Sequence, residues 1–256
     1  MGIPIGYHGA SLSKVREPEL GPDRDLPLIK LSDYTSCMSI AETKLSLPEE
    51  ARANRANRRQ RAQRAETRER LIDGAIRVFA DHGYAQASIE DVLIEAGVSR
   101  ASFYSHFAGK PALAEAIADV LVPLWQPLYA ELAEMGVPSL AALRQWCARN
   151  VALYRLHQDI CMILTQASAI EPDLYEKLTA HREAVAGLLA QRNPALAHLA
   201  TDAGARLRAT LALMQLDLSC YYLGVRHWQD VGNAGVEAMA DQLHHFLTSE
   251  AQKGAA

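Results

Sequence analysis

Residues 88–110 hold the side chains whose types and spacing could do chemistry, and that chemistry is recognition of a nucleic acid. The segment reads Ser-Ile-Glu-Asp-Val-Leu-Ile-Glu-Ala-Gly-Val-Ser-Arg-Ala-Ser-Phe-Tyr-Ser-His-Phe-Ala-Gly-Lys. It predicts two short helices joined by a tight turn at Gly97, with small polar residues facing outward from the second helix. This is the plan of a helix-turn-helix, which lays its second helix in the DNA major groove.

Local start signals support these two helices. Ser88 and Asp91, three residues apart, predict a capping box at the start of the first helix, and Ser99 begins the second. Phe103 and Phe107 are four residues apart, so both are expected to face inward from one side of the second helix.

The chain before this motif divides by composition. Residues 1–50 mix proline, glycine, serine and charges without a period, which indicates a disordered extension, and Met38 within it is an alternative start. Residues 51–66 are interpreted as a basic arm. Its arginines are Arg52, Arg55, Arg58, Arg59, Arg61 and Arg64. The first helix is then expected to begin near Thr67 and to stop at His82-Gly83, with one apolar face between them.

Length and charge fit a small DNA-binding unit joined to a larger second domain. The chain has 256 residues and a net charge of −4, but residues 51–110 carry 11 Lys+Arg against 7 Asp+Glu. This segment suits a polyanionic partner and the rest of the chain does not.

Other classes of protein lack support in the sequence. The cysteines at 37, 147, 161 and 220 are scattered, so neither a metal site nor a disulfide framework is predicted, and no cofactor is expected. No motif of a hydrolase, metalloprotease or phosphate-binding loop occurs, so an enzyme is not expected. No apolar stretch is long enough to span a membrane and no signal peptide is evident, which predicts a cytoplasmic protein.

Beyond residue 111 the pattern stays helical, so the predicted fold class is all-α. Helices are expected near 111–134, 139–157, 159–169, 172–191, 204–228 and 234–250.

Residues 67–117 resemble the N-terminal domain of the tetracycline-repressor (TetR) family of transcriptional regulators. The resemblance is carried by Thr67-Arg68, Ala75, Phe79, Gly83-Tyr84, Ser88-Ile89, Ala96-Gly97-Val98-Ser99, Ser102-Phe103-Tyr104, His106-Phe107, Lys110 and Leu113. It implies a three-helix DNA-binding domain over 67–112 and a helical ligand-binding and dimerisation domain over 113–256. Ala101 and Pro111 depart from the family pattern, which more often has glycine and an acidic residue there.

The resemblance also implies roles for single residues on DNA. Ser99, Arg100, Ala101 and Ser102 would lie at the exposed start of the recognition helix, where base edges are read. Arg100 would either bridge a guanine or contact only phosphate. Ser88, Tyr104, His106 and Lys110 would contact phosphates, although Ser88 also caps its helix.

A dimer is expected from the same resemblance, through segments 204–228 and 234–250. Two apolar stripes run along them. The first holds Leu207, Leu211, Met214 and Leu218, and the second Val236, Met239, Leu243 and Phe246. Such stripes are commonly core, and they form an interface only where the monomer leaves them uncovered.

A ligand cavity inside the second domain is the remaining implication. The candidate lining residues are Trp125, Trp146, Tyr154, His157, Met162, Gln166 and Tyr222. For any single one of them, an ordinary core position is the more common role.

We therefore expect a DNA-binding transcriptional regulator, a repressor released from an inverted-repeat operator by an unknown small molecule. A transcriptional activator and a ligand-independent DNA-binding protein of the same fold are the alternatives.

Overall fold

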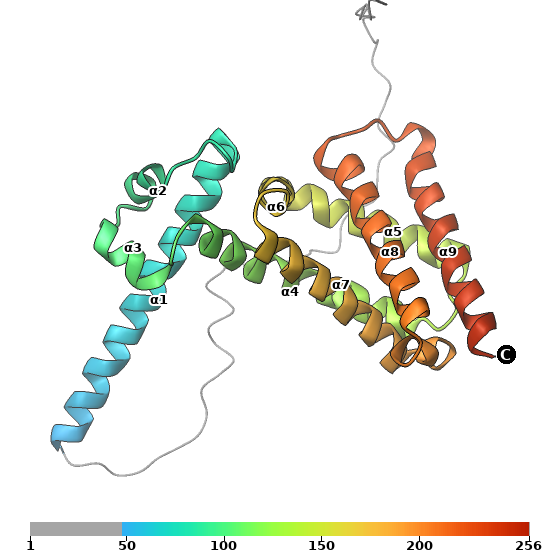
Figure 1. Cartoon of the computed structure of the whole chain (residues 1–256), viewed down its shortest axis with the longest axis horizontal. Coiled ribbons are helices and arrows are strands. Elements are labelled where there is room, and N and C mark those ends of the chain that lie inside the picture. The colour runs from blue at the N-terminus through green and yellow to red at the C-terminus, as the bar shows by residue number, and fades with distance from the viewer. Residues whose placement is uncertain (1–47, 256) are drawn as a thin grey trace, which may run out of the picture. The chain divides into compact units, whose positions relative to one another are not determined.

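The computed structural model describes residues 48–255, which form an all-α structure as predicted, with no strand in that range. The expectations for residues 1–50, including Met38, fall almost wholly outside the described residues. Three helices make the N-terminal part: α1 (Pro48–His82), α2 (Ile89–Ala96) and α3 (Arg100–His106) (Figure 1). The C-terminal part consists of α4 (Lys110–Glu134), α5 (Leu140–Leu156), α6 (Gln158–Ser168), α7 (Pro172–Arg192), η2 (Pro194–Ala200), α8 (Ala203–Cys220), η3 (Tyr221–Val225), η4 (Val231–Asn233) and α9 (Ala234–Gly254).

The first helix starts much earlier than the sequence suggested. The expected start near Thr67 is wrong, because α1 runs without a break from Pro48 to His82. Alanine, arginine and glutamine, which dominate residues 51–65, are all strong helix formers. The Thr67 hydroxyl donates to the Gln63 carbonyl inside the helix, at 2.9 Å, and so does not interrupt it. The basic arm is therefore a helical extension.

The apolar face of α1 begins only at Leu71. Its buried residues are Leu71, Ile72, Ala75, Val78 and Phe79. They join a core with Val92 of α2 and Phe103 of α3. The second half of α1 therefore gains stability from packing within the domain, whereas the side chains described between residues 54 and 66 are exposed.

The C-terminal helices follow the predicted segments closely, with two differences. The segment expected at 204–228 ends as an α-helix at Cys220 and continues as the π-helical turn η3. Gly224 lies in this turn, where a Cβ atom would approach both the Val151 carbonyl and Tyr154 Cβ to 2.9 Å. The absence of a side chain thus permits close contact with α5. The short helix η2 was not predicted.

Buried aromatic side chains anchor the core of the C-terminal part. Trp146 is fully buried and donates its indole N–H to the Leu128 carbonyl at 2.8 Å. Trp125 donates to the Asn150 side chain at 2.9 Å, so both indoles are satisfied away from water.

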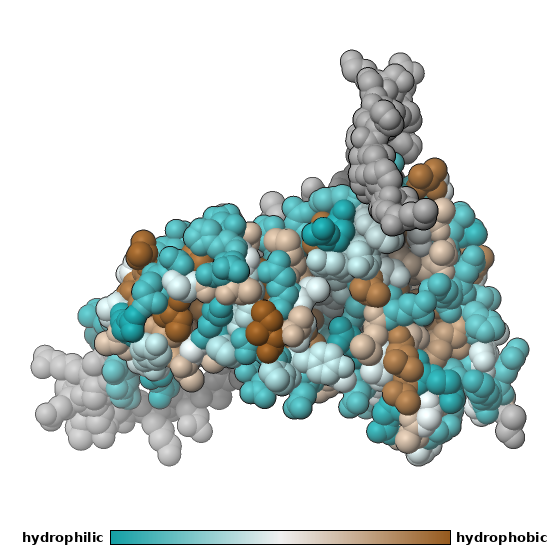
Figure 2. All heavy atoms as spheres, turned by 45° about the horizontal axis from the view of Figure 1, so that its top comes forward, coloured by the Kyte–Doolittle hydropathy of each residue, from teal (hydrophilic) through white to brown (hydrophobic). Residues whose placement is uncertain are grey.

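None of the helices between residues 48 and 255 is long and apolar enough to cross a membrane. The face drawn in Figure 2 is largely hydrophilic, with small hydrophobic groups spread over it.

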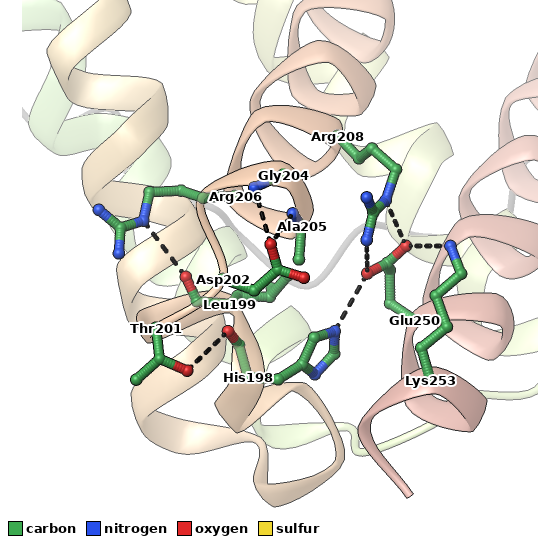
Figure 3. A network of polar contacts seen from close by, with 10 residues as sticks. All are labelled: His198, Leu199, Thr201, Asp202, Gly204, Ala205, Arg206, Arg208, Glu250 and Lys253. Carbon is green, nitrogen blue, oxygen red and sulfur yellow. Dashed lines mark hydrogen bonds and ion pairs between the residues drawn. The ribbon is translucent and has the colours of Figure 1, made fainter. Parts of the chain in front are cut away.

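One buried carboxylate ties η2, α8 and α9 together. The Glu250 side chain is 2% exposed and accepts two hydrogen bonds from the Arg208 guanidinium, at 2.8 and 3.0 Å. Lys253 and His198 approach the same carboxylate at 2.8 and 3.0 Å (Figure 3). These contacts, above all the hydrogen bonds from Arg208, lower the pKa of Glu250 to about 2.

This network predicts acid sensitivity. The folded-state pKa of Glu250 lies below its ordinary value of 4.5, so its stabilisation is fully present above pH 4.5 and lost as the pH falls towards 2. We expect Glu250→Gln to lower the free energy of unfolding by about 2–3 kcal/mol at pH 7 and by much less near pH 2. Denaturant titrations between pH 7 and pH 2.5 measure the difference. Glu237→Gln, at an exposed site on the same helix, is the control. A difference that stays constant with pH would contradict the assignment.

Candidate nucleic-acid interface

Local capping fixes α2 and the turn that follows it. The Ser88 hydroxyl accepts a hydrogen bond from the Asp91 N–H at 3.2 Å, and the Asp91 carboxylate accepts from the Ser88 N–H at 3.0 Å. These two bonds make the predicted capping box. The helix ends at Gly97, whose φ of +61° is the left-handed conformation that favours glycine.

An arginine that sequence reasoning missed secures this turn. One terminal nitrogen of Arg70, on α1, donates hydrogen bonds to the carbonyls of Ala96 and Gly97, at 2.7 and 3.0 Å. These carbonyls lie at the end of α2, where backbone acceptors lack partners within the helix. Arg70 stands in an arginine-rich run, so composition alone could not single it out.

The recognition helix α3 presents two different faces. Ser99 caps it by accepting from the Ser102 N–H at 3.2 Å. Phe103 is fully buried and Phe107, which follows the helix, is 5% exposed, as predicted. The opposite face exposes Arg100, Ala101 and Tyr104, with Ser102 half-buried beside them. The buried phenylalanines therefore hold the residues expected to read DNA on the free side of the helix.

Charged groups surround that free face. Arg100 pairs with Glu90 of α2, and both side chains remain more than half exposed. Arg64 of α1 donates to the Ser105 carbonyl at 3.0 Å, which brings the helical extension to the end of α3. Burial, followed by the charges of Arg64 and Arg68, lowers the pKa of His106, so the imidazole is neutral at pH 7.

The extension carries a concentrated positive charge. Arg55, Arg58, Arg59, Arg61 and Arg64 are all exposed, and the sequence has no acidic residue between 51 and 65. The side chain of Arg52 lies outside the described part of the chain. Figure 1 shows this half of α1 running past α3 as a straight helix.

Lys110 has a different environment from the exposed residues. Its ammonium group donates to the carbonyls of Tyr84, Ala85 and Ala87, at 2.8, 3.4 and 3.1 Å. It also lies 4.6 Å from the centre of the Tyr84 ring. These contacts tie the start of α4 to the loop between α1 and α2. The proposed phosphate contact of Lys110 would have to compete with them.

The two apolar stripes of the C-terminal part differ in how far they are buried. Leu207, Leu211 and Leu218 of α8 are more than half exposed, whereas Met239 and Leu243 of α9 are buried. Met214, Val236 and Phe246 are half-buried. Beside the α8 stripe, helices α8 and α9 enclose a groove of about 460 Å³, lined by residues that include Leu211, Gln215, His245 and Phe246. An uncovered apolar surface thus lies on α8.

A separate cavity of about 110 Å³ lies among α4, α5, α6, α7 and α8. Of the candidate lining residues, Trp125 and Tyr154 line this cavity, and Trp146, His157, Met162, Gln166 and Tyr222 lie outside it. Gln166 instead accepts a hydrogen bond from the Tyr84 N–H at 2.9 Å. The charged or polar residues of the cavity include Asp217, Arg182 and His181, which the sequence did not suggest, and Thr165, whose hydroxyl donates to the Cys161 carbonyl at 2.8 Å. No cluster of metal-binding side chains occurs within residues 48–255.

Comparisons with known proteins agree with this geometry. Residues 71–117 match the model of the bacterial regulatory proteins of the tetR family. The chain is 36% identical over 88 residues to the HTH-type transcriptional regulator SrpR of Pseudomonas putida, covering 34% of this chain and 38% of SrpR. It is 27% identical over 82 residues to the HTH-type transcriptional repressor DhaR of Mycobacterium sp. (strain GP1), covering 32% of this chain and 41% of DhaR.

The likeness in fold extends further than the likeness in sequence. A TetR-family regulator structure from Syntrophomonas wolfei superposes with a TM-score of 0.52 at 14% identity, covering 73% of this chain and 95% of that one. The match spans 37%, 38% and 60% of the length of three curated relatives, less than two thirds of each. The fold and the helix-turn-helix define a helical protein of the nucleic-acid-binding type. Over residues 71–117, which contain the helix-turn-helix, the chain is similar to the TetR family of bacterial regulatory proteins.

The position of Lys110 gives a prediction about folding. We expect Lys110→Met to lower the free energy of unfolding by about 1–3 kcal/mol, because three carbonyls lose a charged donor. Denaturant unfolding measures this, with Arg144→Met at an exposed position of α5 as the control. The opposite result is unchanged stability together with a weaker salt dependence of DNA affinity, by the amount expected for one lost phosphate contact. That result would assign Lys110 to DNA binding instead.

Proposed function

We propose that the chain is a DNA-binding transcriptional regulator that reads an operator with α3. The observation that carries the proposal is the exposed, capped start of α3, held outward by buried Phe103 and flanked by basic side chains. The relatives that share this domain are transcriptional regulators, and DhaR is named as a repressor. Repression is therefore the proposed sign of regulation, with activation as the alternative.

The proposed contacts divide by type. Arg100, Ser99, Ala101 and Ser102 face base edges, because the N-terminal residues of a recognition helix enter the major groove. Exposed Tyr104 and neutral His106 donate hydrogen bonds to phosphates. Ser88 would do so at the start of α2 only by giving up the hydrogen bond that its hydroxyl donates to Asp91 at 2.7 Å. Glu90 holds the Arg100 guanidinium at the surface until DNA replaces it.

The helical form of the basic arm restricts how it can bind DNA. A minor groove about 6 Å wide does not accept an α-helix. We therefore propose that Arg55, Arg58, Arg59, Arg61 and Arg64 line up along the phosphate backbone. Residues 48–66 span roughly 28 Å as a helix. Counterions released by these arginines would add to affinity without adding sequence specificity.

A homodimer is the proposed assembly. The exposed leucines of α8 and the adjacent groove, which has both apolar and polar lining residues, form the surface that a second copy of the chain would cover. Two recognition helices would then address two half-sites about one helical turn of DNA apart, roughly 34–36 Å. An inverted-repeat operator follows from the two-fold symmetry of such a dimer.

The contacts between the two parts support a response to a ligand. Helix α4 begins at Lys110, beside the helix-turn-helix, and contributes Trp125 to the cavity. The loop residue Tyr84 bonds to Gln166 through its N–H, at 2.9 Å, and to Glu171 through its hydroxyl, at 2.7 Å. A ligand that prefers one arrangement of α4 and α6 would therefore shift the position of α3, by an amount limited by that preference. A ligand-independent DNA-binding protein is the alternative.

The role of Arg100 can be tested on a selected operator. We expect Arg100→Ala to weaken binding by about 10- to 100-fold and to relax the preference at one base pair, as loss of a bidentate guanine contact would. Gel-shift or fluorescence titrations of single-base operator variants measure both effects, with Arg144→Ala as the control. An equal loss of affinity for all operator variants would mean that Arg100 contacts a phosphate instead.

The interface on α8 predicts the oligomeric state. We expect Leu211→Glu to shift the protein from dimer to monomer, because it places a charge in the apolar contact. Sedimentation equilibrium measures the change. Leu156→Glu introduces the same charge at another exposed leucine, on α5, and should leave the dimer intact. A dimer unaffected by Leu211→Glu would place the interface elsewhere.

A further inference from the structure

The cavity among α4–α8 is a closely defined site whose chemistry restricts what it can bind. Its wall carries three aromatic rings, Trp125, Tyr129 and Tyr154, with Trp125 and Tyr154 packed edge to face at a centroid distance of 5.1 Å. Aliphatic side chains fill most of the remaining wall: Leu121, Val122, Leu164, Leu178, Val185 and Leu213. Such a lining favours an apolar, flat molecule.

The carboxylate in this wall already accepts three hydrogen bonds. One oxygen of Asp217 accepts the hydroxyls of Tyr154 and Tyr129, at 3.0 and 3.4 Å. The other oxygen accepts the Arg182 Nε–H at 2.7 Å. Desolvation, followed by the charge of Asp217, raises the pKa of both tyrosines, which therefore stay protonated donors. Asp217 has little capacity left for a ligand.

The donors that remain belong to Arg182 and His181. Within the described chain, no hydrogen bond engages the terminal nitrogens of Arg182, and its side chain is only 21% exposed. His181 lines the same cavity, and burial lowers its pKa, so it is uncharged at pH 7. The site thus offers hydrogen-bond donors to one acceptor atom on a ligand.

The charges of the wall cancel. Arg182 and Asp217 neutralise each other, so a charged ligand would bring an uncompensated charge into a largely apolar cavity, which is unfavourable. An amine would have to displace Arg182 from Asp217, and a carboxylate on Arg182 would lie near the Asp217 charge. An uncharged ligand avoids both conflicts.

Size sets the last limit. The volume of about 110 Å³ is below the roughly 150 Å³ of an engineered apolar cavity that holds benzene, so it leaves room for no more than one small ring. We propose that this cavity binds an uncharged molecule with a single aromatic ring and one acceptor oxygen, with the oxygen directed at Arg182 and His181. The inference rests on the proposed function in that such a molecule would be the effector of the regulator.

Four probes of similar size test charge and aromaticity separately. Phenol, benzoate, benzylamine and cyclohexanol are titrated into the full chain at pH 7 by isothermal titration calorimetry. We expect phenol to bind at least ten-fold more tightly than each of the other three. Binding of benzoate, benzylamine or cyclohexanol as tight as that of phenol would overturn the proposal, and so would failure of all four to bind.

Two variants locate the site. Leu178→Trp should fill the cavity and weaken phenol binding at least ten-fold, whereas Leu188→Trp, on the same helix but outside the lining, should not. Asp217→Asn leaves Arg182 uncompensated, so the ratio of benzoate to phenol affinity should rise at least ten-fold. Thermal unfolding checks that each variant folds. If Leu178→Trp does not fold, the test is the ratio of benzoate to phenol affinity in Asp217→Asn. A ratio equal to that of the unchanged protein would overturn the proposal.

Operator binding by the unliganded protein is measured separately. A protein that binds DNA but no probe would contradict only the ligand assignment. A protein that binds phenol but no operator would contradict the proposed function and leave the cavity assignment intact.

Discussion

The burial of Phe103 beneath α3 is the constraint on which the candidate DNA-binding surface depends. A helix of seven residues is too short to be stable alone in water, so its position must come from packing. Phe103 and Phe107 face the core shared with α1, and Gly97 and Arg70 fix the turn that precedes the helix. Because one side of α3 packs against the core, this packing determines which side of the helix is exposed.

The loop between α1 and α2 connects this surface to the rest of the chain. Tyr84 is buried there and contacts Gln166, Glu171 and Lys110, which come from α6, the α6–α7 connection and α4. Desolvation and the neighbouring carboxylate of Glu171 raise the pKa of the Tyr84 phenol, so this hydrogen bond persists over the physiological range. Defined contacts therefore join α4 and α6 to the helix-turn-helix part.

Much of the helix-turn-helix could be predicted because its determinants are local. The capping box, the left-handed glycine and the paired phenylalanines each involve residues within a few positions of one another. The start of α1 was misjudged because the extension has no apolar stripe, and only its intrinsic helix propensity marks it. The Asp217–Arg182 pair joins residues 35 positions apart on different helices, which no sequence period reveals. Which of the two C-terminal stripes stays uncovered also depends on tertiary packing.

Selection of binding sites from fragmented genomic DNA with the purified full chain tests the central claim most directly, followed by titration of the selected site over a range of salt concentrations. The account predicts an inverted repeat that is bound tightly by one dimer, with affinity far above that for random DNA of the same length. Weak binding that is the same for all DNA sequences and depends strongly on salt would contradict it. Such binding would come from the arginines of α1 alone, without recognition of bases by α3.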